Sequence, residues 1–272
     1  MKKIALSILA TASILTSSAT AGIVIDVQAG AGVWQPELTG NMGYGEDALS
    51  VNLELDSELD IKDTSSDFDN NYYYIDVDHF LPIVPNVRVE RLNYSTTGSG
   101  KLLTRVNFGS GSFNASDKVD TQIDMVQNDF ILYWGIPGLN TLSAGILDLD
   151  FGIMAKQLDG YYSVYETGDS SNGDKVDFDV WIPMGYLAVQ VDVPFLPLEL
   201  EVATKMISYE DSEISDNMAK ASLALPIPLP LIDFKLDVGY RDQTLRIDPE
   251  LIGSFNSDIN AKGLFFGLSA KF

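Results

Sequence analysis

The chain has 272 residues, of which 17 are Lys or Arg and 39 are Asp or Glu, so its formal net charge at pH 7 is −22. This balance excludes the basic surface that nucleic-acid binding requires, and the absence of Cys excludes disulfides, thiol catalysis and Cys-ligated metals. With 46% hydrophobic and 10% aromatic residues, the chain nevertheless differs from a disordered acidic sequence.

The first 21 residues have the order of a secretory signal peptide. Lys2 and Lys3 precede an apolar stretch from Ile4 to Leu15, and Ser18–Ala21 supplies small residues for cleavage. Polar residues interrupt the stretch, and it is too short for a transmembrane anchor. We therefore expect an exported mature chain over residues 22–272, with 15 basic and 39 acidic residues and a net charge of −24.

Beyond this segment, side chains alternate between apolar and polar with a period of two, as in strands that separate two environments. Leu147, Leu149 and Phe151, for example, alternate with Asp148 and Asp150. A secreted soluble β-sandwich would also alternate and remains the alternative. The strands are about 10 residues or longer and carry charges at mid-strand, however, which favours a transmembrane barrel with a polar interior.

Aromatic residues collect near the ends of these strands, where outer-membrane barrels carry two girdles at the membrane–water interfaces. The expected girdle residues are Trp34, Tyr133, Trp134, Tyr161, Tyr162, Trp181, Tyr209 and Tyr240.

Proline indicates which way the barrel faces. Eight of the eleven Pro residues lie in four short connections, at 82–86, 135–138, 194–197 and 226–230. Because Pro cannot donate to a strand ladder, it belongs in turns and at strand starts. The other connections are longer and polar; they comprise residues 35–47, 97–117, 157–175, 210–216 and 242–257. Short periplasmic turns opposite long external loops are typical of such barrels.

We therefore predict an all-β fold, a single transmembrane antiparallel up-and-down β-barrel of ten strands, with twelve strands as the alternative. The expected strands are 22–34, 71–81, 86–96, 119–134, 140–156, 176–193, 198–209, 217–225, 231–241 and 258–272.

Three segments do not fit this scheme simply. Residues 49–61 alternate cleanly, but as a spanning strand they would place the Pro82 turn outside the cell, so we expect an excursion in the first loop or over the barrel mouth. Residues 102–108 are expected to form a hairpin extension above the membrane. The apolar face also changes between Met125 and Val126 and near Arg91, which we interpret as β-bulges.

The last strand resembles the C-terminal targeting strand of Gram-negative outer-membrane proteins. It ends on an aromatic residue and has apolar residues at alternate positions, namely Leu264, Phe266, Leu268, Ala270 and Phe272.

The whole mature chain resembles a family of small proteobacterial outer-membrane β-barrel proteins without an assigned activity. The resemblance rests on the signal peptide, the first strand Ala29–Trp34, the P-x-x-P-N turn at Pro82–Asn86 and the run Ile182–Tyr186. It implies an outer-membrane location and contact with outer-membrane lipid and lipopolysaccharide. We also expect the barrel assembly machinery and periplasmic chaperones as partners, and a monomeric protein. The acidic charge balance argues against nucleic acid as a partner.

Enzymatic chemistry has few candidates. Barrel hydrolases of this size depend on His, and the single His79 falls near the periplasmic end on the apolar face. No G-x-S-x-G or H-E-x-x-H motif occurs. We therefore expect no enzyme, no catalytic residues, no cofactor and no resident metal.

Divalent cations on acidic loops are the one ligand of this kind that the sequence leaves open, as bridges to lipopolysaccharide phosphates. The clusters concerned are Asp56-Glu58-Asp60, Asp67-Asp69 and Asp169-Asp174-Asp177, and none has the twelve-residue spacing of a Ca²⁺ loop.

The expected lumen is charged. Its candidate residues are Asp148, Asp150, Asp192, Glu199, Glu201, Asp237, Arg88, Lys205 and Lys235, together with Lys156 and Lys262. One hypothesis is a narrow, cation-preferring channel. The alternative is a lumen plugged by paired charges, in a structural or surface-interaction barrel. A barrel hydrolase acting on lipid or peptide is the third hypothesis.

Overall fold

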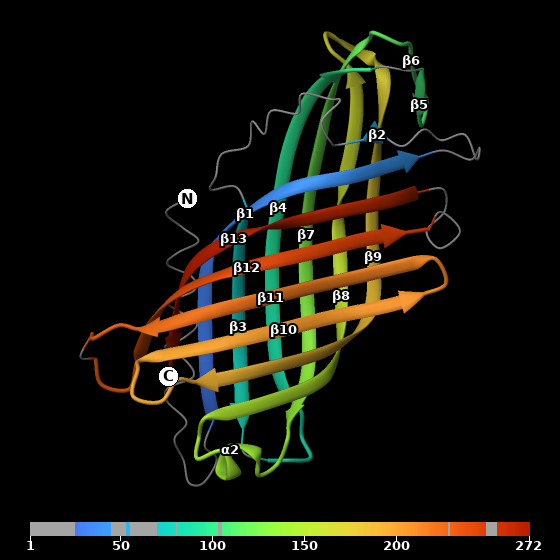
Figure 1. Cartoon of the computed structure of the whole chain (residues 1–272). Coiled ribbons are helices and arrows are strands. Elements are labelled where there is room, and N and C mark those ends of the chain that lie inside the picture. Colours follow the sequence, from blue (N-terminus) through green and yellow to red (C-terminus); the bar gives the residue numbers. More distant parts are fainter. Residues whose placement is uncertain are drawn as a thin grey trace.

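Ten long strands, each antiparallel to its neighbours, make up most of the computed structural model, which describes residues 25–44, 53–54, 70–79, 81–102, 105–227, 229–248 and 255–272 (Figure 1). They are β1 (Ile25–Tyr44), β3 (Asn71–His79), β4 (Asn86–Lys101), β7 (Lys118–Gly135), β8 (Leu147–Glu166), β9 (Asp169–Asp192), β10 (Leu198–Tyr209), β11 (Ser212–Ala224), β12 (Asp233–Ile247) and β13 (Phe255–Lys271). Within these residues, no helix has the length and apolar character needed to span a membrane.

The sheet closes on itself through the pairing of β13 with β1, so the ten-stranded barrel is confirmed. Following paired residues once around the wall from Val27 leads back to β1 at Thr39, a displacement of 12 residues. With ten strands, this stagger corresponds to a strand tilt of about 40° and a backbone radius of about 10 Å. Side chains can fill an interior of that width.

The four Pro-rich connections lie at one end of the barrel, called here the Pro-rich end, together with Ile25 and Phe272 (Figure 1). The connection from β7 to β8 contains α2 (Leu139–Leu142), a single turn of helix, so the strand expected from residue 140 begins at Leu147 instead. Gly138 and Gly145 flank this turn with positive φ angles of 82° and 79°. Glycine adopts these angles without steric cost, so the chain can turn at both points before β8 starts.

At the opposite end, the strands run well beyond their predicted limits. Much of the sequence expected as loops at 35–47 and 157–175 is strand, and only Thr167 and Gly168 connect β8 to β9. The 97–117 connection contains the hairpin of β5 (Val106–Phe108) and β6 (Gly111–Phe113), which agrees in part with the extension expected at 102–108. In the segment 49–61, β2 (Leu53–Glu54) pairs with β1, and the rest lies outside the described residues.

The predicted limits are too short because the barrel wall inverts part-way along the strands. The apolar side chains change face there, while the strands continue. On β4, Val87 and Val89 face outward, whereas beyond Arg91 the apolar Leu92 and Tyr94 are buried inside. Pairing between β4 and β7 and between β7 and β8 is continuous through this level. The prediction of bulges near Arg91 and between Met125 and Val126 is therefore wrong. The apolar and polar faces exchange sides there, while the strand pairing stays regular.

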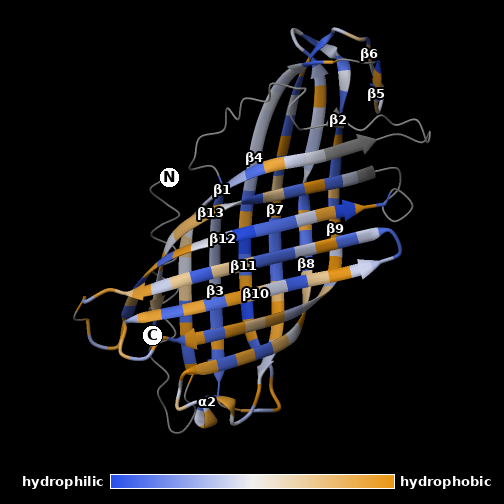
Figure 2. Ribbon diagram, in the orientation of Figure 1, coloured by the Kyte–Doolittle hydropathy of each residue, from blue (hydrophilic) through white to orange (hydrophobic). Residues whose placement is uncertain are grey.

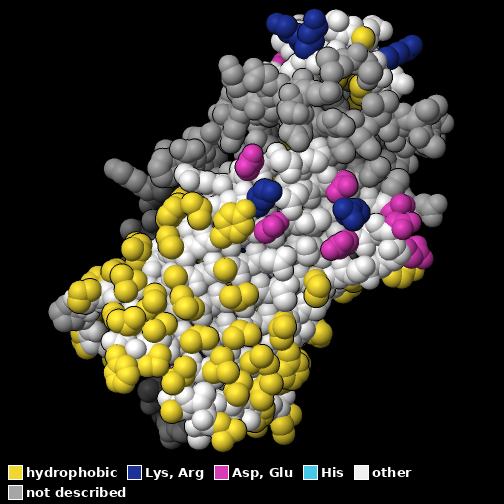
Figure 3. Space-filling view, viewed as in Figure 1, with side chains coloured by type: hydrophobic (Ala, Val, Ile, Leu, Met, Phe, Trp, Pro, Cys, Tyr) yellow, Lys and Arg dark blue, Asp and Glu magenta, His cyan; other side chains and the backbone are white. Residues whose placement is uncertain are grey.

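The change on the outer surface falls at a consistent level on neighbouring strands. Passing away from the Pro-rich end, outward residues change from apolar to polar at the paired positions Val89/Arg91, Phe130/Asn128 and Ala155/Gln157 on β4, β7 and β8. On β13 the same change falls at Leu264/Lys262. Figure 2 shows the same alternation along the strands, and in Figure 3 hydrophobic side chains cover the lower part while charged ones lie above it. The apolar belt spans the membrane, and the wall beyond it has the polar-out, apolar-in pattern of a barrel in water.

Because the wall inverts, only some of the predicted girdle residues lie on the outer surface. Trp134, Trp181 and Tyr240 lie on the outer surface, in agreement with the prediction. Tyr209 is exposed at the end of β10, but it shares the inward face with the buried Glu201 and Lys205, so its assignment to the girdle is wrong. Trp34, Tyr133 and Tyr162 are instead buried inside the barrel, so their assignment to the girdle is wrong. Counting residues from a strand end cannot distinguish a lipid-facing ring from an interior ring when the two faces exchange character.

The last strand presents the face that the sequence predicts. Leu264, Phe266 and Leu268 point outward with exposed fractions of 52%, 42% and 56%, and Ala270 and the half-buried Phe272 follow them. These residues therefore join the apolar belt. Their recognition by an assembly machinery stays a prediction.

A tyrosine ring covers the seam where the barrel closes. A Cβ built on Gly32 would lie 2.4 Å from Cε1 of Tyr72, and one built on Gly267 would lie 2.4 Å from its hydroxyl oxygen. The ring therefore lies against backbone from which side chains are missing on both β1 and β13.

We expect Gly32→Ala to destabilise the barrel by roughly 1–3 kcal/mol, because the added methyl group has to displace Tyr72 or the backbone oxygen of Phe266. Urea unfolding in lipid vesicles measures the effect. Gly185→Ala is the matched control, since its Cβ would meet nothing closer than 3.7 Å and should change stability little. Equal effects of the two changes would contradict the packing described here.

The inversion predicts how the outer surface reacts in intact cells. The chain has no Cys, so single-Cys variants give unambiguous labelling. Asp159 and Ile153 both face outward on β8, but Asp159 lies beyond the belt and Ile153 lies within it. A membrane-impermeant maleimide should label Asp159→Cys and leave Ile153→Cys unlabelled. Labelling of neither or both would contradict this placement.

Candidate functional site in the barrel lumen

The structure brings only some of the predicted lumen residues together. Arg88, Glu201, Lys205, Asp237 and Lys156 are buried inside the barrel, each at most 4% exposed. They come from β4, β10, β12 and β8, and tertiary closure places most of them in one layer.

The other predicted lumen charges lie nearer the Pro-rich end or outside the lumen. Lys235 pairs with Glu199 at 2.6 Å, and Asp148 accepts hydrogen bonds from the side chain of Asn140 in α2. Asp150 is half-buried, and Asp192 is exposed at the end of β9. Lys262 is exposed on the outer surface, so its assignment to the lumen is wrong.

Arg88 is the first centre of the buried layer. Its guanidinium lies 2.9 Å from Glu201, 2.7 Å from Glu90 and 3.5 Å from Asp76. Glu201 also pairs with Lys220 at 2.5 Å. A guanidinium can hydrogen-bond to several carboxylates at once because it presents five N–H donors in one plane.

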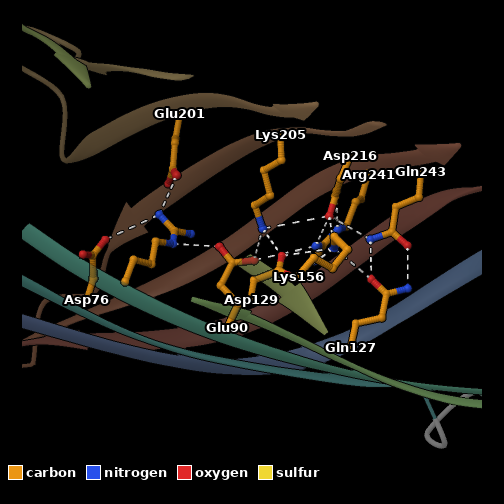
Figure 4. A network of polar contacts seen from close by, with 11 residues as sticks. Asp76, Glu90, Gln127, Asp129, Lys156, Glu201, Lys205, Asp216, Arg241 and Gln243 are labelled. Carbon is orange, nitrogen blue, oxygen red and sulfur yellow. Dashed lines mark hydrogen bonds and ion pairs between the residues drawn. The ribbon is translucent and has the colours of Figure 1, made fainter. Parts of the chain in front are cut away.

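Lys205 extends the layer across the lumen. Its ammonium group donates to Glu90 and to Asp129, at N–O distances of 2.5 and 2.7 Å. Lys156 pairs with the same Asp129 at 2.9 Å and with Asp216 at 3.3 Å. Shared carboxylates therefore join separate pairs into one network (Figure 4).

Asp216 is the second centre. Arg241 donates to both of its carboxylate oxygens, at 2.8 and 2.5 Å, which is the bidentate geometry that arginine favours. Gln243 also donates to Asp216, at 2.9 Å, and exchanges hydrogen bonds with Gln127 at 3.1 and 3.2 Å. The two amides form a layer over the charged network on the side away from the Pro-rich end.

Together these charged residues form what we call the plug. It consists of the five carboxylates of Asp76, Glu90, Asp129, Glu201 and Asp216 and the five cations of Arg88, Lys156, Lys205, Lys220 and Arg241. Each residue is at most 9% exposed, and the formal charges balance. An uncompensated ion in this environment would cost several kcal/mol. The carboxylate of Asp237, which is also fully buried and has no hydrogen-bond partner among the described residues, lies outside this balance.

The plug bonds cross the lumen. Arg88 and Glu90 stand on β4, whereas their partners Glu201 and Lys205 stand on β10, and three strands lie between β4 and β10 in the sheet. Gln127 on β7 meets Gln243 on β12, which is five strands away in the ten-stranded wall. These side chains therefore close the interior at this level.

Six of the ten plug residues were not predicted from the sequence. Glu90 lies next to the presumed bulge at Arg91, and Asp216 precedes the start assigned to its strand, so neither was assigned to the lumen. Asp76, Asp129, Lys220 and Arg241 were missed as well. The available signal was strict alternation continued through Arg91 and Met125, which places Glu90 and Asp129 inside.

Beyond the amide layer, the interior becomes apolar. A hollow lies here that encloses about 40 Å³, or about 630 Å³ when the open space next to it is counted. It is lined by residues of β1, β12 and β13 on one side and β4, β7, β8 and β9 on the other. Its lining residues are Trp34, Leu38, Tyr94, Ile123, Met125, Gln127, Leu158, Phe178, Val180, Gln243, Leu245, Ile247, Ser257, Ile259 and Ala261.

The remaining candidate residues lie outside the lumen, apart from the charged network. The ring nitrogen Nε2 of His79 lies 3.1 Å from the carbonyl oxygen of Pro85, in the Pro-rich end where the sequence placed it. Asp177 pairs with Lys175, and the backbone N–H of Ser110 lowers the pKa of Asp174. Within the described ranges, no three His, Asp or Glu side chains gather as a metal site. The acidic clusters at 56–60 and 67–69 lie outside those ranges.

Comparison with known proteins yields architectural likenesses. No protein-family model and no curated protein matches the sequence. Among solved structures, the outer membrane protease OmpT from Escherichia coli aligns at 10% identity and a TM-score of 0.49, over 94% of this chain and 99% of that one. Neisserial surface protein A aligns at 12% identity and a TM-score of 0.28, over 92% and 99%. The CymD monoaromatic hydrocarbon channel aligns at 6% and 0.27, over 91% and 87%. Likenesses of this degree say nothing about activity.

Removing one cation from the plug should be costly. Lys156→Met keeps the side-chain length but leaves Asp129 and Asp216 with one buried cation fewer, so we expect a loss of roughly 3–5 kcal/mol in unfolding free energy. Adding Asp129→Asn restores the charge balance and should recover part of that loss. Lys175→Met, which breaks an exposed pair, is the control and should cost at most about 1 kcal/mol. Similar losses in the buried and exposed variants would refute the plug's role.

Proposed function

We propose that this chain is a non-enzymatic outer-membrane β-barrel with a closed lumen, acting as a structural or surface-interaction barrel rather than as a narrow channel. The observation that carries the proposal is the plug, whose ion pairs join β4 to β10 across the interior.

A conducting pore needs a hydrated path, and ten strands leave little room for one. With a backbone radius of about 10 Å, inward side chains several ångströms long meet near the axis. Arg88 and Lys205 do so here and are at most 4% exposed. The cation preference expected from the acidic lumen loses its basis as well, because the plug carries as many cations as carboxylates.

The absence of enzymatic activity belongs to the same proposal. The imidazole of His79 faces the carbonyl of Pro85 in a turn at the Pro-rich end, away from the barrel mouth. General acid–base chemistry on a surface substrate would require it near that mouth. The position of the ring therefore supports a barrel without hydrolase activity.

The surroundings proposed for the barrel follow from its outer surface. The apolar belt would contact outer-membrane lipid directly, as a monomer. The polar wall beyond the belt would stand among lipopolysaccharide head groups and solvent, and the taller strands β4, β7, β8 and β9 would reach farthest from the membrane (Figure 1). Surface interactions would then involve this outer wall and the mouth.

Planar-bilayer recording tests the closed lumen. We expect no current steps from the correctly inserted protein, because the plug leaves no hydrated path. A charge-balanced quadruple change of Glu90, Arg88, Glu201 and Lys205 to Ala removes the bonds between β4 and β10 and should produce steps. Insertion is verified separately by protease resistance and by the gel shift on heating.

Current steps from the unmodified protein would overturn the proposal, whatever the variant does. Cation-selective steps of equal size in both proteins would show in addition that ions bypass the plug.

A further inference from the structure

The hollow beyond the plug is an apolar surface inside a part of the barrel that stands in water. Its walls include Leu158 and Val180 from one side and Leu245 and Ile259 from the other. Water inside such a space loses hydrogen bonds without gaining partners, so the transfer of a hydrocarbon group into it is favourable.

The polar groups of the lining are already satisfied within the protein. Gln127 and Gln243 bond to each other, and Gln243 also donates to Asp216 of the plug. The indole N–H of Trp34 donates to the carbonyl of Gly263, and the hydroxyl of Ser257 donates to the carbonyl of Leu245. None of these four side chains therefore needs a polar ligand atom, and a ligand with a buried charge would find no counter-charge among the lining residues.

We propose that this hollow binds a small uncharged hydrocarbon, such as a single aromatic ring or a short alkyl chain. The proposal rests on the closed lumen, because the plug and its amide layer form the floor on which the ligand would stop. The hollow encloses about 40 Å³ within a larger open space of about 630 Å³, so it limits the ligand to a small molecule.

Trp34 gives a direct readout of the hollow. It lines the hollow and is 1% exposed, while the chain's other two Trp residues, Trp134 and Trp181, lie on the outer surface. The double variant Trp134→Phe/Trp181→Phe therefore fluoresces from Trp34 alone. With this protein in lipid nanodiscs, bromobenzene should quench Trp34 in a saturable manner, because bromine quenches indoles on contact.

Two variants that fill the hollow and one matched control test where the probe binds. Ala261→Phe and Val180→Phe each place a ring in the hollow from opposite walls and should weaken the saturable quenching at least tenfold. Ala219→Phe adds the same ring on the exposed outer face of β11 and should leave it unchanged. The variant with Trp181 alone reports simple partitioning of the probe into lipid, which should rise without saturation.

Several outcomes would overturn the inference. Quenching of Trp34 that never saturates, or that is equal in folded Ala261→Phe and Val180→Phe proteins, would show that the probe is only in the lipid. Equal quenching by 4-bromobenzoate would show that charge is tolerated, contrary to an apolar site. If both filling variants fail to fold, the parent protein tests the inference. Saturable quenching that unbrominated benzene displaces and benzoate does not displace would support it. Quenching that does not saturate, or that benzene cannot displace, would contradict it.

This experiment and the bilayer recording fail independently. A conducting protein that still shows saturable Trp34 quenching would refute the closed lumen and keep the ligand site. A silent protein without saturable quenching would refute the site and keep the closed lumen.

Discussion

Charge neutralisation across the lumen is the interaction on which the other features depend. Five carboxylates and five cations lie inside a barrel too narrow to hydrate them, so each has to meet an opposite charge on another strand. Such a network contributes little net stability compared with an apolar filling, but it penalises any arrangement that leaves one ion unpaired. The network thereby couples two features of the wall, because it pairs its ions only when both are formed. These are the register of β4 against β7 and the closure that brings β10 opposite β4.

The plug also lies at the level where the wall changes its surroundings. Glu90 and Asp129 face inward next to Val89 and Phe130, the last apolar residues of the belt on their strands. Below that level, lipid requires an apolar exterior and the interior can be polar. Above it, water requires a polar exterior, and the interior becomes the hydrophobic core. One chain thus combines a membrane barrel and a soluble-type barrel on continuous strands.

This division gives the two proposals a common physical basis. A charged layer that holds opposite walls together closes the path through the membrane, and the apolar interior leaves a hollow on the side of this layer away from the Pro-rich end. The strong acidity of the sequence is correspondingly divided. Acidic residues inside are largely neutralised by the plug, whereas others, such as Asp159, Asp177 and Asp179, lie exposed on the outer wall.

Alternation with period two determined the fold class from sequence, because successive side chains of a strand point to opposite faces and so separate lipid from lumen. The placement of Pro likewise located the turns of the Pro-rich end. Tertiary structure alone decided where the alternation inverts and which charges meet. Arg88 and Glu201 are 113 residues apart, and only closure of the ten-stranded wall brings them to 2.9 Å. Local periodicity reports that two environments differ across a strand, but which environment lies inside depends on the height of the membrane along the closed barrel.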